Sequence, residues 1–402
     1  MLVAFGSGLA VFSLLLLGKG STTTQFVTLP IVGHALFISS GQIGESSNQG
    51  IMDELLVELS NVPNPGSGKS YYGWLEPDIG QTTIGNQATR APVLLGKLPV
   101  QNGKIEYLYP GDAQHTNLLA TTSRFLITEQ DTATQPFIPS PDTSTWRYSA
   151  QLFPLRFPLP TNGSISTPQS RPPIGTLGST ALTNLRYLLA GAPSQIGLPG
   201  GLDIWLFRNA EKVLEWSVTA RDDWQTQSYP EVHRDAVRIL DYLDGLSLVQ
   251  QDAPGEPVYV TPTNAQVGLL DVNPSKHGIL YTIDVDLNAL IQSPSSTSDQ
   301  RKLATQIDNA VKNVETWLTN VRKDAQQLEP MSSAQLAQTT TRDNLLDTMS
   351  DEALAAFAGR LNPGTGSVQE GVTQIHYDIQ RLATFDIHTV SAGCTTYVCR
   401  RT

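Results

Sequence analysis

Charged residues are scarce in this chain. They make up 16 % of its 402 residues, whereas about a quarter is usual for a soluble domain. Glycine and proline are by contrast numerous, at 32 and 26 residues, and they favour turns and irregular structure. The composition therefore fits a β-rich, loop-rich extracytoplasmic protein better than a cytosolic enzyme, and the length favours two domains.

The sequence also lacks the short motifs of several common active sites. It has no Gly-x-Ser-x-Gly, the nucleophile turn of many serine hydrolases. Gly68-Lys69-Ser70 is similar to the end of a phosphate-binding loop, but Pro63 stands where that loop needs glycine. None of the six histidines lies at metal-binding spacing from a cysteine or another histidine, so we expect surface or capping roles for them. We predict no catalytic, cofactor-binding or metal-ligating residue, and no cofactor.

Negative charge is concentrated in the second half of the chain. Residues 1–200 carry 10 Lys+Arg against 11 Asp+Glu, and residues 201–402 carry 16 against 26, which gives net charges of −1 and −10. An acidic surface repels nucleic-acid phosphates and anionic lipid headgroups. We therefore expect no nucleic-acid partner.

An uncharged, apolar segment of seventeen residues runs from Leu2 to Gly18, just before Lys19. It is slightly short for a membrane span and slightly long for the core of a signal peptide. We predict that residues 1–20 form a transmembrane anchor that meets the lipid bilayer through residues 2–18; a cleaved signal and a buried helix are the alternatives. The protein would then be a single-pass cell-membrane protein with the bulk of the chain extracytoplasmic.

Short strand-like runs separated by turn residues follow, up to residue 153. Asn102-Gly103 separates two apolar runs, and both residues tolerate the positive φ of a type I′ turn. Trp74 shares one face of its run with Tyr72, and we expect it to be buried between two sheets. About seven or eight such runs predict a β-sandwich over residues 21–153.

Several of these runs carry a distinctive series of residues. The series is Gly68-Lys69-Ser70-Tyr71-Tyr72-Gly73-Trp74-Leu75, then Leu95-Gly96-Lys97-Leu98-Pro99, then Asn102-Gly103 and finally Phe125-Leu126-Ile127-Thr128-Glu129. Over roughly residues 25–155 the chain resembles the extracytoplasmic domain of anti-sigma-K factors. The resemblance implies a non-catalytic domain outside the membrane, with Trp74, Gly96, Asn102 and Gly103 in structural roles. A full anti-sigma factor has a cytosolic, sigma-binding domain before its membrane span. Nothing here precedes Leu2, so we expect this chain not to hold a sigma factor.

A proline-rich stretch, residues 154–174, is predicted to be an extended linker. Residues 175–390 beyond it show mostly helical patterns, with one helix starting at Pro230 and the clearest one at Ser298. The run Ile279–Leu287 is predicted to be a strand. The whole chain would be an α+β protein with a β domain and a helix-rich α+β domain, each folding independently.

The tail, residues 391–402, holds both cysteines. Cys394 and Cys399 are five positions apart, which is not the spacing of a Cys-x-x-Cys redox motif. In an oxidising compartment they would close a small disulfide loop, and two free thiols are the alternative.

Three functions remain open at this point. We expect a non-catalytic, membrane-anchored envelope protein that senses, scaffolds or binds an envelope protein or a surface ligand. The second possibility is a fragment of an anti-sigma factor-like transmembrane regulator whose cytosolic domain is missing. The third is an envelope hydrolase, which would need a cleft with converging polar residues.

Overall fold

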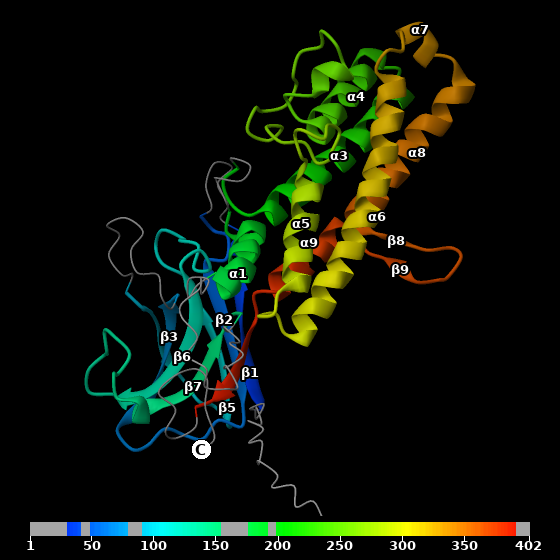
Figure 1. The fold of residues 1–402 in the computed structure, drawn as a ribbon. Helices are drawn as coiled ribbons and strands as arrows, with labels where there is room; N and C mark the ends of the chain where they lie inside the picture. The colour runs from blue at the N-terminus through cyan, green and yellow to red at the C-terminus, as the bar shows by residue number, and fades with distance from the viewer. Residues whose placement is uncertain (1–29, 42–48, 79–90, 154–175, 192–197, 391–402) are drawn as a thin grey trace, which may run out of the picture.

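The computed structural model describes residues 30–41, 49–78, 91–153, 176–191 and 198–390. An eight-stranded antiparallel sheet forms one part of the molecule, and a group of helices packs against one end of it (Figure 1). The strands of this sheet are β1 (Ile31–Ile38), β2 (Glu54–Ser60), β3 (Lys69–Pro77), β4 (Val93–Leu98), β5 (Lys104–Tyr109), β6 (Thr122–Asp131), β7 (Trp146–Gln151) and β10 (Phe385–Thr389). The helices are α1 (Thr176–Leu189), α3 (Leu202–Gln225), α4 (Tyr229–Asp244), α5 (Ile279–Gln292), α6 (Ser298–Leu328), α7 (Ser333–Leu336), α8 (Thr339–Ala358) and α9 (Val372–Arg381). A separate hairpin is made of β8 (Arg360–Leu361) and β9 (Val368–Gln369).

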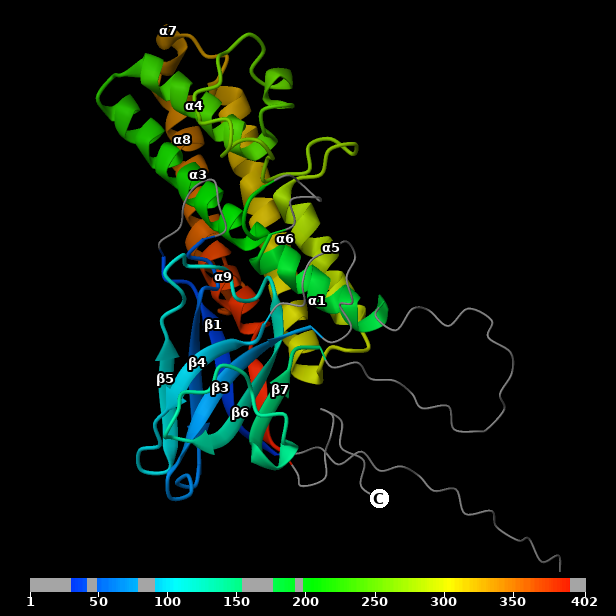
Figure 2. The same ribbon diagram turned by 90° about the vertical axis from the view of Figure 1, so that its left-hand side faces the viewer.

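All eight strands belong to one sheet, in the order β4-β3-β6-β7-β10-β1-β2-β5. The predicted β-sandwich of two sheets is therefore wrong. The sheet curves until its edge strands β4 and β5 approach each other (Figure 2), where the Tyr107 hydroxyl of β5 donates a hydrogen bond to the carbonyl of Leu95 in β4 at 2.7 Å. Alternating sequences bury one face of a strand in either architecture, so the pattern alone could not separate a sandwich from a nearly closed sheet.

The turn Asn102-Gly103 connects the two edge strands. Its φ values of 52° and 74° fit the type I′ turn expected from the sequence. Only Gln101 and Lys104 pair directly across it; beyond them β4 pairs with β3 and β5 pairs with β2. Gly96 has a φ of 124°, and a Cβ atom there would lie 2.7 Å from the Tyr107 hydroxyl. Both glycines therefore serve the closure of the sheet.

Strand β10 comes from the C-terminal end of the described chain, yet it lies inside the sheet. It pairs with β1 on one side and with β7 on the other, and in Figure 1 it is the red arrow among strands of the first half. The predicted boundaries, 21–153 and 175–390, separate this strand from the sheet that it completes. We therefore replace the expectation of two independently folding domains with that of one folding unit.

The two faces of the sheet bury different clusters. Phe37, Phe125 and Phe385 belong to one core that continues without a break into the helices. Trp74 is fully buried, as predicted, but it packs on the opposite face with Tyr72 and Leu126 rather than between two sheets. Its indole N–H donates a hydrogen bond to the hydroxyl of Thr128 at 2.9 Å, which satisfies the polar atom of a buried tryptophan.

Two helices follow the sequence signals closely. Helix α4 has Pro230 in its first turn and is capped at its C-terminal end by Gly245, whose φ is 80°. Helix α6 starts at Ser298, as predicted, behind a capping box formed by Thr297 and Gln300. The predicted strand at 279–287, by contrast, is helix α5. Its buried positions recur at helical spacing while Val285 is 44 % exposed, so the period is 3.6 rather than 2.

The membrane prediction is also corrected. Within the described ranges, no helix combines the length and the apolar character that crossing a bilayer requires. The longest of those helices, the 31-residue α6, buries one face and exposes a charged one. The predicted single-pass architecture and cell-membrane localisation are thus not indicated by the part of the chain that the structure describes. Residues 2–18, the linker 154–174 and the pair Cys394 and Cys399 lie outside the described residues.

Arg186 of α1 joins the first helix to the sheet. Its guanidinium makes two hydrogen bonds to the Asp78 carboxylate, at 2.7 and 2.9 Å, and donates further ones to the carbonyls of Leu119 and Thr122. The side chains of Arg186 and Asp78 are only 15 % and 11 % exposed. A bidentate pair of this kind fixes orientation as well as distance.

Candidate functional site: a cavity between the sheet and the helices

A cavity of about 330 Å³ lies where the sheet meets the helices. We call it the junction cavity. Its walls come from the end of β1, the segment before β2, the end of α1, the start of α3 and one face of α9. The apolar part of the lining consists of Ile38, Ile51, Met52, Leu188, Leu189, Ile204 and Phe207. The polar side chains among them are Ser39, Asp203, His376, Tyr377 and Gln380.

Glycine lets the walls of this cavity approach one another. Gly201 precedes α3, and a Cβ atom there would lie 2.2 Å from the carbonyl oxygen of Leu188 in α1. Gly200 has a φ of 78°, which glycine adopts at little cost. The chain can therefore turn tightly into α3 and place Asp203 in the first helical turn, where the helix dipole favours a negative charge.

Asp203 and His376 form a buried pair in the cavity wall. Asp203 is 3 % exposed, and its Oδ2 lies 2.7 Å from Nδ1 of His376. Burial raises the pKa of Asp203, and the hydrogen bond and charge of His376 offset this only in part. Burial lowers the pKa of His376, but its hydrogen bond to Asp203 and the charge of that carboxylate outweigh burial, so the pKa is raised. Both shifts mean that the two groups release their protons at a higher pH than the free side chains would.

The other polar atoms of this pair, Nε2 of His376 and Oδ1 of Asp203, differ in whether they have a hydrogen-bond partner. Nε2 of His376 accepts a hydrogen bond from the Gln380 side-chain amide at 2.8 Å, and the imidazole ring lies 4.9 Å from the Phe207 ring. Oδ1 of Asp203 is buried and has no partner among the described residues. A buried carboxylate oxygen without a partner costs about 1–3 kcal/mol or more, so a hydrogen-bond donor at this oxygen would stabilise the protein.

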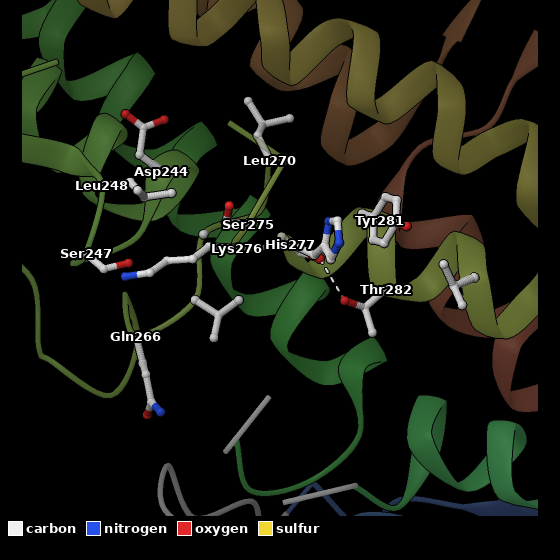
Figure 3. Close-up of a pocket in the computed structure, with 14 residues that line it drawn as sticks. Asp244, Ser247, Leu248, Gln266, Leu270, Ser275, Lys276, His277, Tyr281 and Thr282 are labelled. Atoms are coloured by element: carbon white, nitrogen blue, oxygen red, sulfur yellow. Dashed lines mark hydrogen bonds between the residues drawn. The ribbon is translucent and has the colours of Figure 1, made fainter. Parts of the chain in front are cut away.

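A second cavity, of about 460 Å³, lies beside the long α4–α5 loop and the start of α5 (Figure 3). Several of its polar groups have partners within the chain. The His277 ring stacks on Tyr281 at 3.9 Å and lies 3.2 Å from Asp271. Asp244 is held by Arg322, and the Thr282 hydroxyl donates to the carbonyl of Gly278. The Oδ2 atom of Asp244 has no partner among the described residues, so the junction cavity differs from this one mainly in the buried Asp203–His376 pair in its wall.

Ser40, His115 and Asp53 only superficially resemble a catalytic triad. The Ser40 hydroxyl and an Asp53 carboxylate oxygen both face Nδ1 of His115, at 3.4 and 2.7 Å. In a working triad the carboxylate and the nucleophile contact different ring nitrogens. Asp53 also accepts a hydrogen bond from the backbone N–H of Ser40, so this group ties the end of β1 to the start of β2.

Sequence reasoning missed the junction cavity. The predicted structural residues Trp74, Gly96, Asn102 and Gly103 lie in the sheet, and the cavity lining includes none of them. His376, expected at the surface or in a cap, is instead a partner of Asp203. The two are separated by 173 positions, and no local pattern marks such a pair. The one signal available in the sequence was that His376 directly follows Ile375, a residue of the apolar face of α9.

Comparison with family models, curated proteins and solved structures finds no match to this chain. The strands that carry the resemblance to anti-sigma-K factors, β3, β4 and β6, are neighbours in the sheet. The resemblance itself stays a prediction.

Several buried aspartates of the helical part make stability depend on pH. Burial is the main cause that raises the pKa of Asp235, Asp241 and Asp324 to about 6 and that of Asp244 to about 7. A carboxyl group whose pKa is higher in the folded state contributes stability in full below its unfolded-state pKa, about 3.9. This contribution is lost as pH rises through the folded-state pKa. We therefore expect the melting temperature to fall between pH 5 and pH 8.

Asp241→Asn tests this expectation at a single residue. Asp241 is fully buried, one of its oxygens accepts the Tyr259 N–H at 3.0 Å, and the other has no partner among the described residues. Asparagine imitates the neutral acid, so the variant should be more stable than the parent at pH 8, by on the order of 1 kcal/mol, and this advantage should be smaller at pH 5. Exposed Asp222→Asn is the matched control and should differ at neither pH. Equal stability of Asp241→Asn and its parent at pH 8 would refute the argument.

Proposed function

We propose that this chain is a non-catalytic binding protein that holds a small, mainly apolar molecule in the junction cavity. The observation that carries the proposal is the buried Oδ1 of Asp203, which has no partner among the described residues. A ligand with a hydroxyl, amide or amine group would donate a hydrogen bond to this oxygen. The proposal keeps the binding role expected from the sequence and assigns it a place in the fold.

The shape and chemistry of the cavity support this choice. Its volume of about 330 Å³ is at the lower end for small-molecule sites, which are mostly apolar with a few placed polar groups. The apolar lining would bury the body of the ligand, at about 25 cal/mol per Å² of apolar surface. An anionic group would meet the Asp203 carboxylate and be repelled, so we expect alcohols or amines rather than acids.

A hydrolase is the second candidate, because Asp203 contacts His376 as the orienting acid contacts the base in acid–base catalysis. One contact favours binding instead. The Gln380 amide donates to Nε2 of His376, the nitrogen that would take the proton from a nucleophile. Catalysis would require this amide to move away, whereas binding leaves it in place.

Titration calorimetry with a matched set of probes tests the proposal. Benzyl alcohol should bind more tightly than toluene, which lacks the donor, and benzoate should not bind. Ile38→Trp should abolish binding of benzyl alcohol, because Ile38 lines the cavity. Ile31→Trp, on the same strand at a 51 % exposed position, should bind it normally. The proposed site would be contradicted if benzyl alcohol and benzoate bound equally well. It would also be contradicted if Ile38→Trp and Ile31→Trp bound benzyl alcohol equally well.

A further inference from the structure

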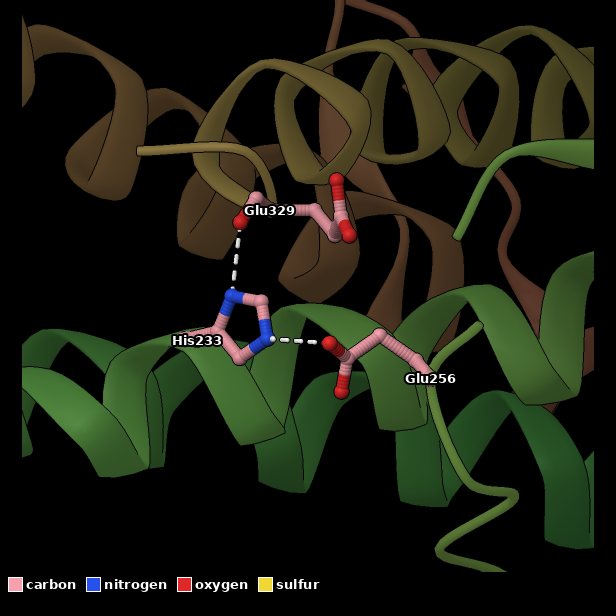
Figure 4. A group of neighbouring side chains, drawn as sticks. All are labelled: His233, Glu256 and Glu329. Carbon is pink, nitrogen blue, oxygen red and sulfur yellow. Dashed lines mark hydrogen bonds and ion pairs between the residues drawn. The ribbon is translucent and has the colours of Figure 1, made fainter. Parts of the chain in front are cut away.

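His233, Glu256 and Glu329 converge from three separate segments of the helical part (Figure 4). His233 lies in α4, Glu256 in the α4–α5 loop, and Glu329 caps the C-terminal end of α6. One nitrogen or oxygen from each side chain lies within 4.8 Å of the other two. The three residues are far apart in sequence, but their side chains surround a common point.

The backbone fixes how the His233 ring presents its nitrogens. Nδ1 lies 2.6 Å from the carbonyl oxygen of Glu329, which can only accept, so Nδ1 carries the hydrogen. In the neutral ring, Nε2 then has a free lone pair and faces the carboxylate of Glu256. Metal-binding histidines are held in this way, with one N–H donated to a carbonyl or carboxylate and the other nitrogen on the metal.

The spacing of the donor atoms suits a bound cation. Nε2 of His233 lies 3.4 Å from Oε1 of Glu256. Metal–ligand bonds of about 2.0–2.1 Å in a tetrahedral site place neighbouring ligand atoms about 3.4 Å apart. The flexible side chain of Glu329 can bring its carboxylate to the same distance. The side chains of His233 and Glu256 are 28 % and 29 % exposed, so solvent can deliver an ion and complete its coordination.

The surrounding charges also favour a cation. A carboxylate oxygen of Glu256 and one of Glu329 both lie within 4.8 Å of a nitrogen of His233. Two negatively charged groups therefore meet at one histidine nitrogen. The Tyr259 hydroxyl donates to the second oxygen of Glu256 at 3.4 Å and helps to orient that carboxylate.

We propose that His233, Glu256 and Glu329 bind one divalent transition-metal ion, with water in the remaining positions. One imidazole nitrogen and two carboxylates favour zinc, manganese or iron over magnesium and calcium, which prefer oxygen ligands alone. The ion would fasten the α4–α5 loop and the end of α6 to α4. This site is independent of the junction cavity, so neither proposal depends on the other.

Zinc binding to the full-length protein, measured by calorimetry, tests this site. Both cysteines are first replaced, as Cys394→Ser and Cys399→Ser, so that thiolates cannot take the metal. We expect one zinc ion per chain and a higher melting temperature with zinc. His233→Asn retains a donor for the Glu329 carbonyl but loses Nε2. It should weaken zinc binding by more than about 100-fold, which exceeds the usual loss when a residue that only contacts a metal ligand is replaced.

Two further variants make the outcome decisive. Glu256→Gln removes one ligand charge at constant shape and should also weaken zinc binding, which keeps the test valid if His233→Asn does not fold. His277→Asn changes a histidine that pairs with Asp271 outside this cluster and should bind zinc normally. Absence of zinc binding, or equal affinity in the parent, His233→Asn and Glu256→Gln, would overturn the site and leave an ion pair between His233 and Glu256.

Discussion

Replacing Phe385 by alanine is expected to lower the free energy of unfolding by about 3–5 kcal/mol, the usual cost of truncating a buried aromatic residue. Phe385 lies in β10 and is fully buried. Its ring centroid lies 5.5 Å from that of Phe37 and 6.1 Å from that of Phe125, so the last strand of the described chain fills the core between earlier ones. Denaturant unfolding, followed by circular dichroism, measures the change.

Asp386→Ala is the matched control for this prediction. Asp386 is the next residue of β10, its side chain is 44 % exposed, and it forms a solvent-accessible ion pair with His34. Exposed ion pairs contribute less than about 1 kcal/mol, so this variant should remain close to the parent. If Phe385→Ala costs no more than Asp386→Ala, β10 does not support the sheet as the structure indicates.

Arg186→Met is expected to destabilise the protein by about 3–5 kcal/mol, the usual effect of removing one partner from a buried ion pair. The substitution keeps most of the apolar stem but leaves the Asp78 carboxylate without its guanidinium. Burial raises the pKa of Asp78, and the Arg186 hydrogen bonds and charge outweigh burial and lower it. The stability from this carboxylate is present above its unfolded pKa and is lost as pH falls, so the penalty should shrink in acid.

The double variant Arg186→Met with Asp78→Asn separates charge from packing. Removing the stranded carboxylate should recover part of the lost stability, because no uncompensated charge remains. Thermal unfolding of the parent, the two single variants and the double variant, each at pH 7 and in acid, gives the values that the comparison needs. A double variant as unstable as the sum of both single ones would show that the two residues do not act as a pair.

Local signals in the sequence predicted local structure well. Pro230 and Gly245 mark the two ends of α4, and Asn102-Gly103 makes the expected turn. In each case neighbouring residues carry the whole signal. Helix α5 was misjudged because Ile283, Val285 and Leu287 alternate as a strand would, and only tertiary packing decides which of them is buried.

Long-range structure could not be predicted in the same way. Strand β10 has five residues, and nothing in them specifies pairing with β1 and β7, which both lie in the first half of the chain. The partnership of Asp203 with His376 is likewise long-range, because it joins α3 to α9 across 173 positions of the chain. The candidate site thus results from the topology of the chain, which local patterns do not encode.

The imidazole nitrogens of the histidines, observed by ¹H–¹⁵N NMR while benzyl alcohol is added, test the central claim most directly. The ring of His376 lines the junction cavity, His277 lines the second cavity, and His233 lies at the proposed metal site. Binding in the junction cavity predicts that the signals of His376 shift and saturate while those of His277 and His233 stay unchanged. Shifts of His277 alone, or no shift of any histidine, would contradict it.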